Sequence, residues 1–424
     1  MAKKNLSIIS LGCFRNTYDS ESALKRFLDT GYRFSAQENI FLTGIEDFKN
    51  CDTLVINTCG FIDKAKEESV EFIKEAVKLK QQGRIKHLLV FGCLVERYHE
   101  KLKKSFPEVD QWWGAEKFIQ TFTERKKLLP SHIDFLKICE GCLNKCSYCT
   151  IPYIKGSLKS KPLNEVIKEA KFLDGKGIKE LNIIGQDITS WGRDLKTKKD
   201  LSLLVKEVLK NTKNIRWIRL LYTHPCHLDN KLIDIIANEE RVCKYIDLPI
   251  QHINNRILKA MNRNITKKEI VNLVNKIRKN IKNCTIRTSV ITGFPTETEK
   301  EFKELLKSMR EIKFERLGAF MYSREENTPA YDLNPQVNNK VKERRFREIM
   351  SLQQDISREA NKRFLGQELD VLVEEKENEV FVGRSQFDAY EVDGAVFLKK
   401  DKLKIGDFYK AKIIDSYDYD LVGV

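Results

Sequence analysis

Three cysteines within eight residues constrain this chain more than any other feature of its sequence. They are Cys142, Cys146 and Cys149, and their C-x₃-C-x₂-C spacing places three thiolates on one tight loop. A closed iron–sulfur site takes four cysteine ligands. A [4Fe–4S] cluster held by only three would leave one iron open to a substrate or cofactor, and we interpret the loop as such a site.

Two other metal sites compete with this interpretation. Cys139 extends the pattern to C-x₂-C-x₃-C-x₂-C, which suggests zinc. Zinc ribbons separate their two CxxC pairs by roughly 15–20 residues so that the chain can reverse, whereas three residues separate them here. A ferredoxin-like electron-transfer cluster with Cys139 as the fourth ligand is the second alternative.

The sequence predicts a cytoplasmic protein without membrane contact. No apolar stretch approaches the roughly 18 residues that a membrane-spanning helix needs. The apolar run after the basic N-terminus stops at Leu11, which is too short for a secretory signal. Cytoplasmic thiols stay reduced, so the eleven cysteines favour metal or cluster ligation over disulfides.

Three further cysteines, Cys13, Cys59 and Cys93, each lie just beyond an apolar run. We expect these runs, at 6–11, 53–56 and 87–91, to be buried parallel strands. The carboxyl ends of parallel strands meet at one edge of an open α/β sheet, where ligands bind. A buried core cysteine is the commoner role for each one alone, but three equivalent positions favour a second three-thiolate site.

Alternating strand and helix patterns predict an α/β fold in two parts, followed by a small β-barrel. In residues 1–120, the strands alternate with helical patterns at 18–30 and 63–82, which predicts an open parallel sheet covered on both faces. From about 132 to 360, roughly six β/α units predict a complete or partial barrel, with its site at the carboxyl ends of the strands. In this span, strands are expected at 181–185, 215–221, 244–248, 285–291 and 316–321, and helices at 162–175, 201–211, 266–281, 297–312 and 339–364. After Gly366, short alternating strands predict a five-stranded antiparallel β-barrel.

Charge divides the chain unevenly. Residues 366–424 hold 14 acidic and 8 basic residues, a net charge of −6. Since the whole chain carries +15, the preceding 365 residues carry +21. A basic surface favours polyanions such as RNA, although a lysine-rich composition alone gives the same total. The acidic C-terminal segment would instead repel RNA phosphates and attract a lysine-rich protein.

The cysteine loop resembles that of the radical S-adenosylmethionine (SAM) superfamily. Cys142, Cys146 and Cys149, with the aromatic Tyr148 before the last cysteine and a β/α domain directly after, carry this resemblance. It implies that SAM chelates the open iron through its amino and carboxylate groups and that Tyr148 lies near the adenine. It also implies that an electron from the cluster splits SAM to give a 5′-deoxyadenosyl radical.

Over essentially its whole length the chain is similar to the methylthiotransferases of that superfamily. The shared segments are NTCGFIDKAKEES (57–69), GCLVERY (92–98), EGCLNKCSYC (140–149), IGQD (184–187), LPIQH (248–252) and TGFPTET (292–298). The resemblance implies an N-terminal domain at 1–125 with an auxiliary cluster, a radical SAM core at 132–362 and a TRAM-like β-barrel for substrate recognition at 365–424. The chain departs from the family at Phe14-Arg15, where Pro-Lys is usual, and at the additional thiol of Cys139.

Within the family the chain is similar to the RimO-like branch, through GFI (60–62), AKEES (65–69) and YEVDG (390–394). This implies that a methylthio group is added to the β-carbon of an aspartate in small-subunit ribosomal protein twelve. It implies SAM and two [4Fe–4S] clusters as cofactors, with the auxiliary cluster on Cys13, Cys59 and Cys93. It further implies a reductant such as flavodoxin or ferredoxin. A MiaB-like enzyme that modifies a tRNA adenosine and a non-catalytic iron–sulfur protein are the alternatives.

Four more residues are candidates for contacts to SAM. Gln186 and Asp187 end the first strand after the cysteine loop, where the resemblance places contacts to the SAM amino group; a water-exposed strand end is the alternative. Arg287 lies within an apolar strand, and a charge there needs a partner, for which SAM or a substrate carboxylate is suitable. Gly293 follows that strand and would let the backbone approach the adenine, or form a plain turn.

Overall fold

In the described residues between 4 and 113, apolar strands separated by amphipathic helices form a parallel sheet. The computed structural model describes residues 4–34, 51–117, 119–196, 199–400 and 402–424. The sheet has the order β2-β1-β3-β4-β5, and every neighbouring pair is parallel. Its strands are β1 (Asn5–Ser10), β2 (Arg33–Phe34), β3 (Thr53–Thr58), β4 (His87–Gly92) and β5 (Gln111–Trp113).

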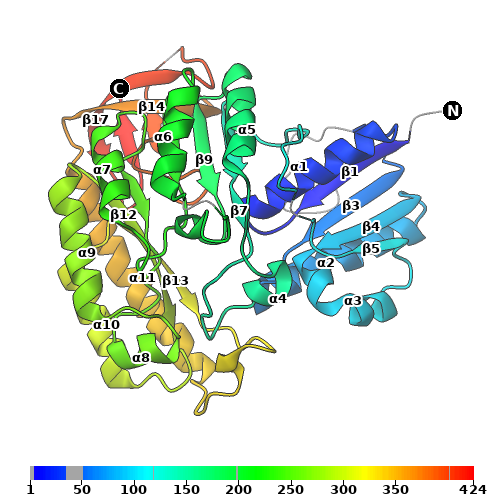
Figure 1. Ribbon diagram of the computed structural model, residues 1–424, viewed down its shortest axis with the longest axis horizontal. Coiled ribbons are helices and arrows are strands. Elements are labelled where there is room, and N and C mark those ends of the chain that lie inside the picture. Colours follow the sequence, from blue (N-terminus) through cyan, green and yellow to red (C-terminus); the bar gives the residue numbers. More distant parts are fainter. Residues whose placement is uncertain (1–3, 35–50, 118, 197–198, 401) are drawn as a thin grey trace.

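Helices cover this sheet on both faces (Figure 1). Successive strand residues point to opposite faces, and here both faces are apolar. Ile56 packs in one core with α2 (Asp63–Gln81) and α3 (Cys93–Ser105), while its neighbour Val55 packs in another with α1 (Phe14–Asp29). The predicted open α/β sheet is therefore confirmed.

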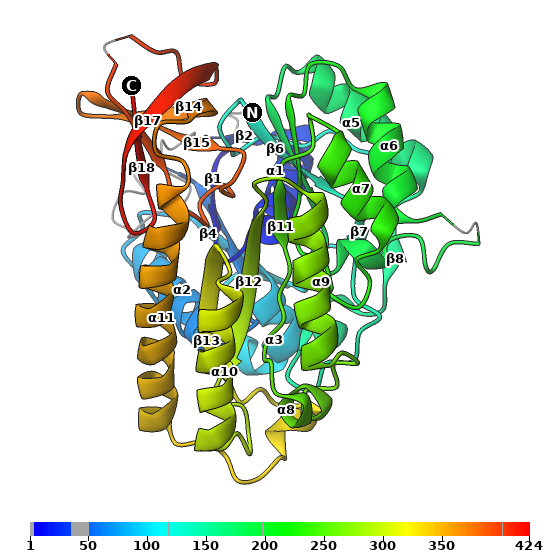
Figure 2. The same ribbon diagram turned by 90° about the vertical axis from the view of Figure 1, so that its left-hand side faces the viewer.

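Six parallel strands form an incomplete barrel in the middle of the chain. They lie in two three-stranded sheets, β10-β9-β6 and β11-β12-β13, which a single bridge between Ile218 and Val242 connects. The strands are β6 (Ile133–Lys137), β9 (Glu180–Ile184), β10 (Trp217–Leu220), β11 (Tyr245–Asp247), β12 (Thr285–Thr292) and β13 (Arg316–Met321). The intervening helices are α5 (Leu163–Gly175), α6 (Leu201–Asn211), α7 (Asn230–Asn238), α9 (Lys267–Asn280) and α10 (Glu299–Ile312), and Figure 2 shows α9 and α10 on the outside of the strands.

The sequence pattern predicted five of these strands but not β6. The two charges in β6, Asp134 and Lys137, hide its apolar character, yet all five of its residues are buried. Both charges are neutralised by contacts from distant residues, since Arg125 pairs with Asp134 and Asp19 pairs with Lys137. Buried charges are tolerated when they are paired in this way.

A long helix and a closed barrel complete the chain. Helix α11 (Asn339–Lys362) lies along β13 and leads into the barrel, whose strand order is β14-β15-β16-β18-β17. The strands are β14 (Glu368–Glu377), β15 (Val380–Ser385), β16 (Val396–Leu398), β17 (Phe408–Ser416) and β18 (Leu421–Gly423). Four neighbouring pairs are antiparallel and β16 runs parallel to β18. Across the described residues, no helix combines the length and apolar character needed to cross a bilayer.

Buried ion pairs attach the C-terminal barrel to the central strands. Glu180 of β9 accepts from Arg219 at 2.7 Å and from Arg384 of β15 at 2.6 Å. Arg316 of β13 donates twice to Asp388, at 2.7 and 2.9 Å. Because these groups are almost fully buried, removing one partner leaves an uncompensated charge in the interface.

Replacing Glu180 with glutamine should destabilise the protein in a pH-dependent way. Burial raises the pKa of this carboxyl, but Arg384 and Arg219 lower it further, to about 2 from an ordinary 4.5. A carboxyl with a depressed folded-state pKa stabilises the fold above its unfolded pKa and loses that contribution as the pH falls toward 2. Glu180→Gln should therefore lose about 3 kcal/mol at pH 7.

Thermal unfolding of the metal-free wild-type and Glu180→Gln proteins at pH 7 and near pH 3.5 would measure the difference in their stability. The exposed Glu379→Gln is the matched control and should unfold like wild type at both values. A Glu180→Gln protein as stable as wild type at pH 7 would contradict the assignment.

Candidate active site

Cys13, Cys59 and Cys93 gather at one edge of the N-terminal sheet. They follow β1, β3 and β4, three adjacent parallel strands, so all three leave at the carboxyl edge as expected. Cys13 is exposed, whereas Cys59 and Cys93 are about 9% and 8% exposed. None of the three forms a disulfide, so the edge presents three free thiols, a donor set suited to iron.

Two glycines permit this close approach. Gly12 has φ +89°, and a Cβ there would lie 2.9 Å from the sulfur of Cys59. Gly92 has φ +111°, and a Cβ there would meet Asn57 and the backbone of Thr58. Glycine is the residue that adopts such φ values without strain, so the loops before Cys13 and Cys93 both require it.

Asn16 and Asn57 hold the three loops together, and the sequence pattern did not single them out. The amide of Asn16 donates to Leu11 O at 2.8 Å and to Thr58 O at 3.2 Å, and its oxygen lies 3.7 Å from the Cys93 sulfur. The amide of Asn57 donates to Asn16 O at 2.8 Å. Both asparagines are buried, so each fixes a thiol-bearing loop rather than meeting solvent.

The three thiols differ in acidity. Burial raises the pKa of Cys59 to about 11 and that of Cys93 to about 12. Although the protein around Cys13 raises the pKa of this exposed thiol, the charge of Arg15 and the backbone N–H groups of Asn16 and Arg15 outweigh that effect and lower the pKa overall. Thiolates are the metal-binding form, so metal binding at this edge must release protons from the two buried thiols.

The second group of thiols lies on the loop that follows β7 (Cys139–Glu140). Cys142, Cys146 and Cys149 are half-buried, and Asn144 donates to the Cys142 sulfur through its backbone and side-chain nitrogens, each at 3.4 Å. Cys139 stands apart: it is fully buried, its sulfur is 3.8 Å from Asp187 O, and Gly185 packs against it. In the described parts of the chain, no three His, Cys, Asp or Glu side chains are close enough to hold a single metal ion.

Gln186 and Asp187 are buried, which excludes the water-exposed strand end. Asp187 accepts hydrogen bonds from Asn144 at 2.8 Å, Ser190 at 2.7 Å and His227 at 3.0 Å. Burial raises its pKa, but the hydrogen bonds from His227, Ser190 and Thr189 lower it well below its ordinary value. Gln186 is different, because its side-chain oxygen is buried and has no hydrogen-bond partner. That oxygen is free to accept from a ligand amino group.

A cavity of about 250 Å³ lies between the N-terminal sheet and the barrel strands. Tyr148 of the cysteine loop, Gln251 and Arg287 line its barrel side, and Phe61 and Ile62, which follow Cys59, line the other. Arg287 is paired with two carboxylates, Asp247 at 3.3 Å and Asp393 of the C-terminal barrel at 3.5 Å. All three parts of the fold therefore contribute to this site.

Two lining residues have strained backbones. Tyr222 and Gln251 have φ values of +75° and +69°, which side chains other than glycine rarely adopt. Such outliers concentrate at functional sites. Tyr222 follows β10. Its position at the carboxyl end of a barrel strand could have identified it from the sequence as a site residue.

Arg263 is a site residue that no sequence pattern marked. It is about 5% exposed, donates to Pro249 O at 2.7 Å and to Tyr148 Oη at 3.3 Å, and lies 4.0 Å from the Cys146 sulfur. Gly293, by contrast, packs against Lys342 of α11, where a Cβ would clash, and its backbone N–H donates to Glu297. The structure thus gives Gly293 a turn and a helix contact.

Four buried charges connect the two groups of thiols. Lys137 of β6 contacts Asp19 and Glu140, both at 2.7 Å, and Lys155 of α4 (Ile151–Lys155) contacts the same two acids at 2.9 and 2.8 Å. Asp19 lies on α1, which begins directly after Cys13, and Lys155 follows the loop of Cys142. This charge ring (Asp19, Lys137, Glu140 and Lys155) fixes the separation of the two thiol groups.

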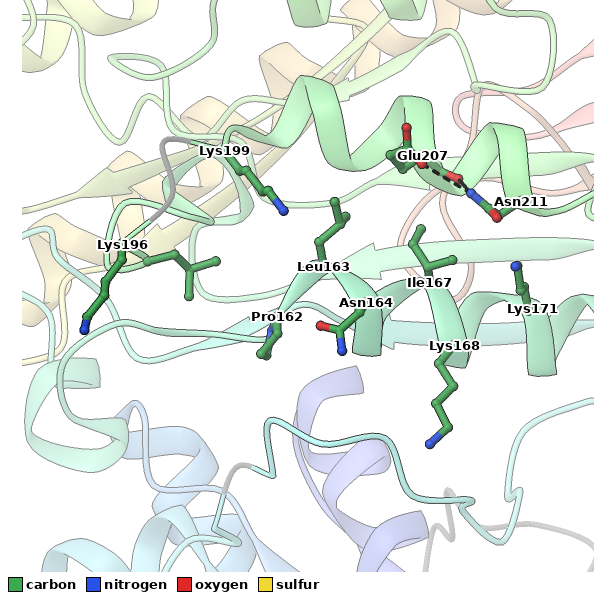
Figure 3. A pocket seen from close by; sticks show the side chains of 11 residues that line it. Pro162, Leu163, Asn164, Ile167, Lys168, Lys171, Lys196, Lys199, Glu207 and Asn211 are labelled. Atoms are coloured by element: carbon green, nitrogen blue, oxygen red, sulfur yellow. Dashed lines mark hydrogen bonds between the residues drawn. The ribbon is translucent and has the colours of Figure 1, made fainter.

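A larger hollow of about 720 Å³ lies away from these residues, between α5 and α6 (Figure 3). Lysines line it, among them Lys168, Lys171, Lys196 and Lys199, together with Glu207 and Asn211. No cysteine lines it. It is a basic surface groove that shares no lining residue with the cavity beside the thiols.

Replacing Gly12 with alanine should remove iron from one thiol group only. The new Cβ would press on the Cys59 sulfur, so the Cys13, Cys59 and Cys93 site should lose its metal while the Cys142 loop keeps its own. If each thiol group holds one [4Fe–4S] cluster, iron should fall by about four atoms per chain in anaerobically reconstituted protein. Gly31→Ala is the control, because its φ of +96° imposes similar strain with nothing within 4 Å. Equal iron in both variants would contradict the site.

Comparisons with known proteins agree with this geometry. Residues 136–309 match the radical SAM superfamily, residues 365–424 match the TRAM domain, and residues 5–114 match the uncharacterized protein family UPF0004. Among solved structures, the radical SAM methyltransferase TsrM from Kitasatospora setae has a TM-score of 0.53 at 12% identity, covering 78% of this chain and 77% of that one. This likeness shows a shared fold.

Curated relatives match the entire chain. The ribosomal protein uS12 methylthiotransferase RimO of Thermoanaerobacter sp. (strain X514) is 42% identical over 446 residues, covering 99% of both chains. The protein of the same name from Geobacter sulfurreducens is 40% identical over 451 residues, covering 100% of this chain and 98% of its own. The chain therefore belongs to the RimO family of methylthiotransferases within the radical SAM superfamily.

Proposed function

We propose that this enzyme adds a methylthio group to the β-carbon of an aspartate in small-subunit ribosomal protein uS12. The names of the relatives support the ribosomal protein as the substrate. The observation that best supports the reaction is the pair of three-thiol groups that the charge ring holds beside one cavity. Its ribosomal substrate places the reaction in the cytoplasm.

Each thiol group holds one [4Fe–4S] cluster in this proposal. Cys142, Cys146 and Cys149 bind the cluster that meets SAM, and Cys13, Cys59 and Cys93 bind the auxiliary cluster. When bound, the clusters and SAM supply the radical, the sulfur and the methyl group. Reducing the cluster takes an external electron, so a donor such as flavodoxin or ferredoxin is part of the system.

The protein side chains bind and orient SAM and keep water out of the cavity. Gln186 offers its unpartnered oxygen to the SAM amino group, while Asp187 and Asn144 fix the loop beside it. Tyr148, Arg287 and Gly293 complete the proposed SAM contacts, with Tyr148 at the adenine and held by Arg263. A cavity lined mainly by apolar and aromatic groups keeps water from a reactive radical.

We divide the work among three domains. Residues 1–125 carry the auxiliary cluster, residues 132–362 form the radical SAM core, and residues 365–424 form a TRAM-like barrel that recognises the substrate. The acidic charge of the last domain favours a basic ribosomal protein over RNA.

Two cysteine variants should separate the proposed cluster roles. Cys142→Ala should abolish reductive SAM cleavage, because the SAM-binding cluster is lost. Cys13→Ala should still cleave SAM but should add no sulfur to uS12. Chromatography of 5′-deoxyadenosine and mass spectrometry of uS12 measure the two steps. Methylthiolated uS12 from the Cys13→Ala enzyme would refute the role of the auxiliary cluster.

Cells that lack the gene test the substrate. We expect uS12 from these cells to lack the mass of one methylthio group, while the tRNA nucleosides remain unchanged. Mass spectrometry of both fractions decides between the protein and a tRNA adenosine. If the tRNA lacked a methylthio group while uS12 kept its own, the enzyme would be the RNA-modifying alternative. The basic charge of the first 365 residues favours that alternative.

A further inference from the structure

Arg15 reaches from the auxiliary thiol group into the radical SAM side of the site. It stands two residues after Cys13 at the start of α1, and its Nη1 is 3.8 Å from the Cys13 sulfur. Its Nε donates to Gly185 O at 2.8 Å, next to Gln186. Its guanidinium carbon lies 5.1 Å from the centre of the Tyr222 ring, which lines the cavity. One cation therefore contacts both halves of the site.

The arginines of this site differ in what neutralises them. Arg287 already has two carboxylates, from Asp247 and Asp393, and Arg263 is buried and bonded to Pro249 and Tyr148. Arg15 is half-buried, and within the described parts of the chain no carboxylate lies within ion-pair distance of it and no acceptor meets its Nη2. A guanidinium so placed has unused donors for a bidentate anion.

The chemistry of the proposed substrate supplies that anion. In aspartate the carbon that receives sulfur is bonded directly to the side-chain carboxylate. A cation that holds this carboxylate must therefore lie between the source of the sulfur and the source of the radical. Arg15, which contacts Cys13 on one side and the backbone beside Gln186 on the other, occupies that position.

We propose that Arg15 binds the side-chain carboxylate of the substrate aspartate and selects aspartate over asparagine at the reaction centre. This inference rests on the proposed function. A site built to bind a charged group rejects a neutral analogue because its own charge is left unpaired. Arg15 thus acts through substrate contact, while the Cys13 sulfur stays with the cluster.

Two other roles for Arg15 predict different results. A cation beside Cys13 would also tune the auxiliary cluster, and a cation near Gln186 would also bind the carboxylate of SAM. The first role changes the spectrum or potential of the cluster, and the second changes the affinity for SAM. Neither changes the preference between aspartate and asparagine in the protein substrate.

The experiment measures binding of purified uS12 to the anaerobically reconstituted full-length enzyme with SAM, by titration calorimetry. Three forms of uS12 are compared, with the target aspartate intact or replaced by asparagine or alanine. Wild-type enzyme should bind the aspartate form about tenfold or more tightly than the asparagine form. Arg15→Gln should lose this preference, and Arg15→Lys, which keeps the charge, should retain part of it.

Arg26→Gln is the matched control, since Arg26 lies on the same helix but is half exposed and paired with Glu116 at 2.6 Å. It should keep the full preference. SAM affinity and the absorption spectrum are recorded for each variant. If Arg15→Gln keeps the preference, whether or not SAM affinity or the spectrum changes, the inference is overturned. If wild-type enzyme neither binds nor modifies uS12, the proposed function itself fails, and the two failures are thus distinguishable.

Discussion

The buried charge ring is the constraint on which the site depends. Asp19, Lys137, Glu140 and Lys155 alternate in sign, so each charge has two opposite neighbours within 3 Å and the ring is neutral overall. Burial raises the pKa of Asp19, but the two lysines outweigh it and lower the pKa. Removing one member would leave an uncompensated buried charge, and it would also remove a contact between the N-terminal sheet and the barrel.

The ring matters for function because its members flank the thiols. The helix that carries Asp19 begins directly after Cys13 and presents Arg15 one turn earlier, so a single rigid element sets the positions of the Cys13 thiol and of a cation. Lys155 and Glu140 lie on either side of the cysteine loop. Reactions that join groups from two centres need them held in a fixed geometry, which a paired and buried ring provides.

The acidic character of the C-terminal barrel has two uses. Part of it attaches the barrel to the basic core, through Asp388 with Arg316, Asp370 with Arg216 and Asp418 with Arg358. Asp393, in the YEVDG segment, pairs with Arg287, which lines the cavity between the N-terminal sheet and the barrel strands. Only the carboxylates outside such pairs are available to a basic partner, so the net charge of −6 overstates the field at the surface of the barrel.

The sequence by itself determined most of the helices and strands and the grouping of the cysteines into two sets of three. Helix 201–211 and strand 316–321 have the predicted bounds, because hydrophobic periodicity and caps act locally. The shared edge of Cys13, Cys59 and Cys93 followed from the geometry of parallel strands. Tertiary structure alone decided the contact of Arg15 with Gly185, 170 residues away, and the burial of β6 with its charges. Such partners meet only when the chain has folded, since spacing along the sequence encodes periodicity and not which distant side chains become neighbours.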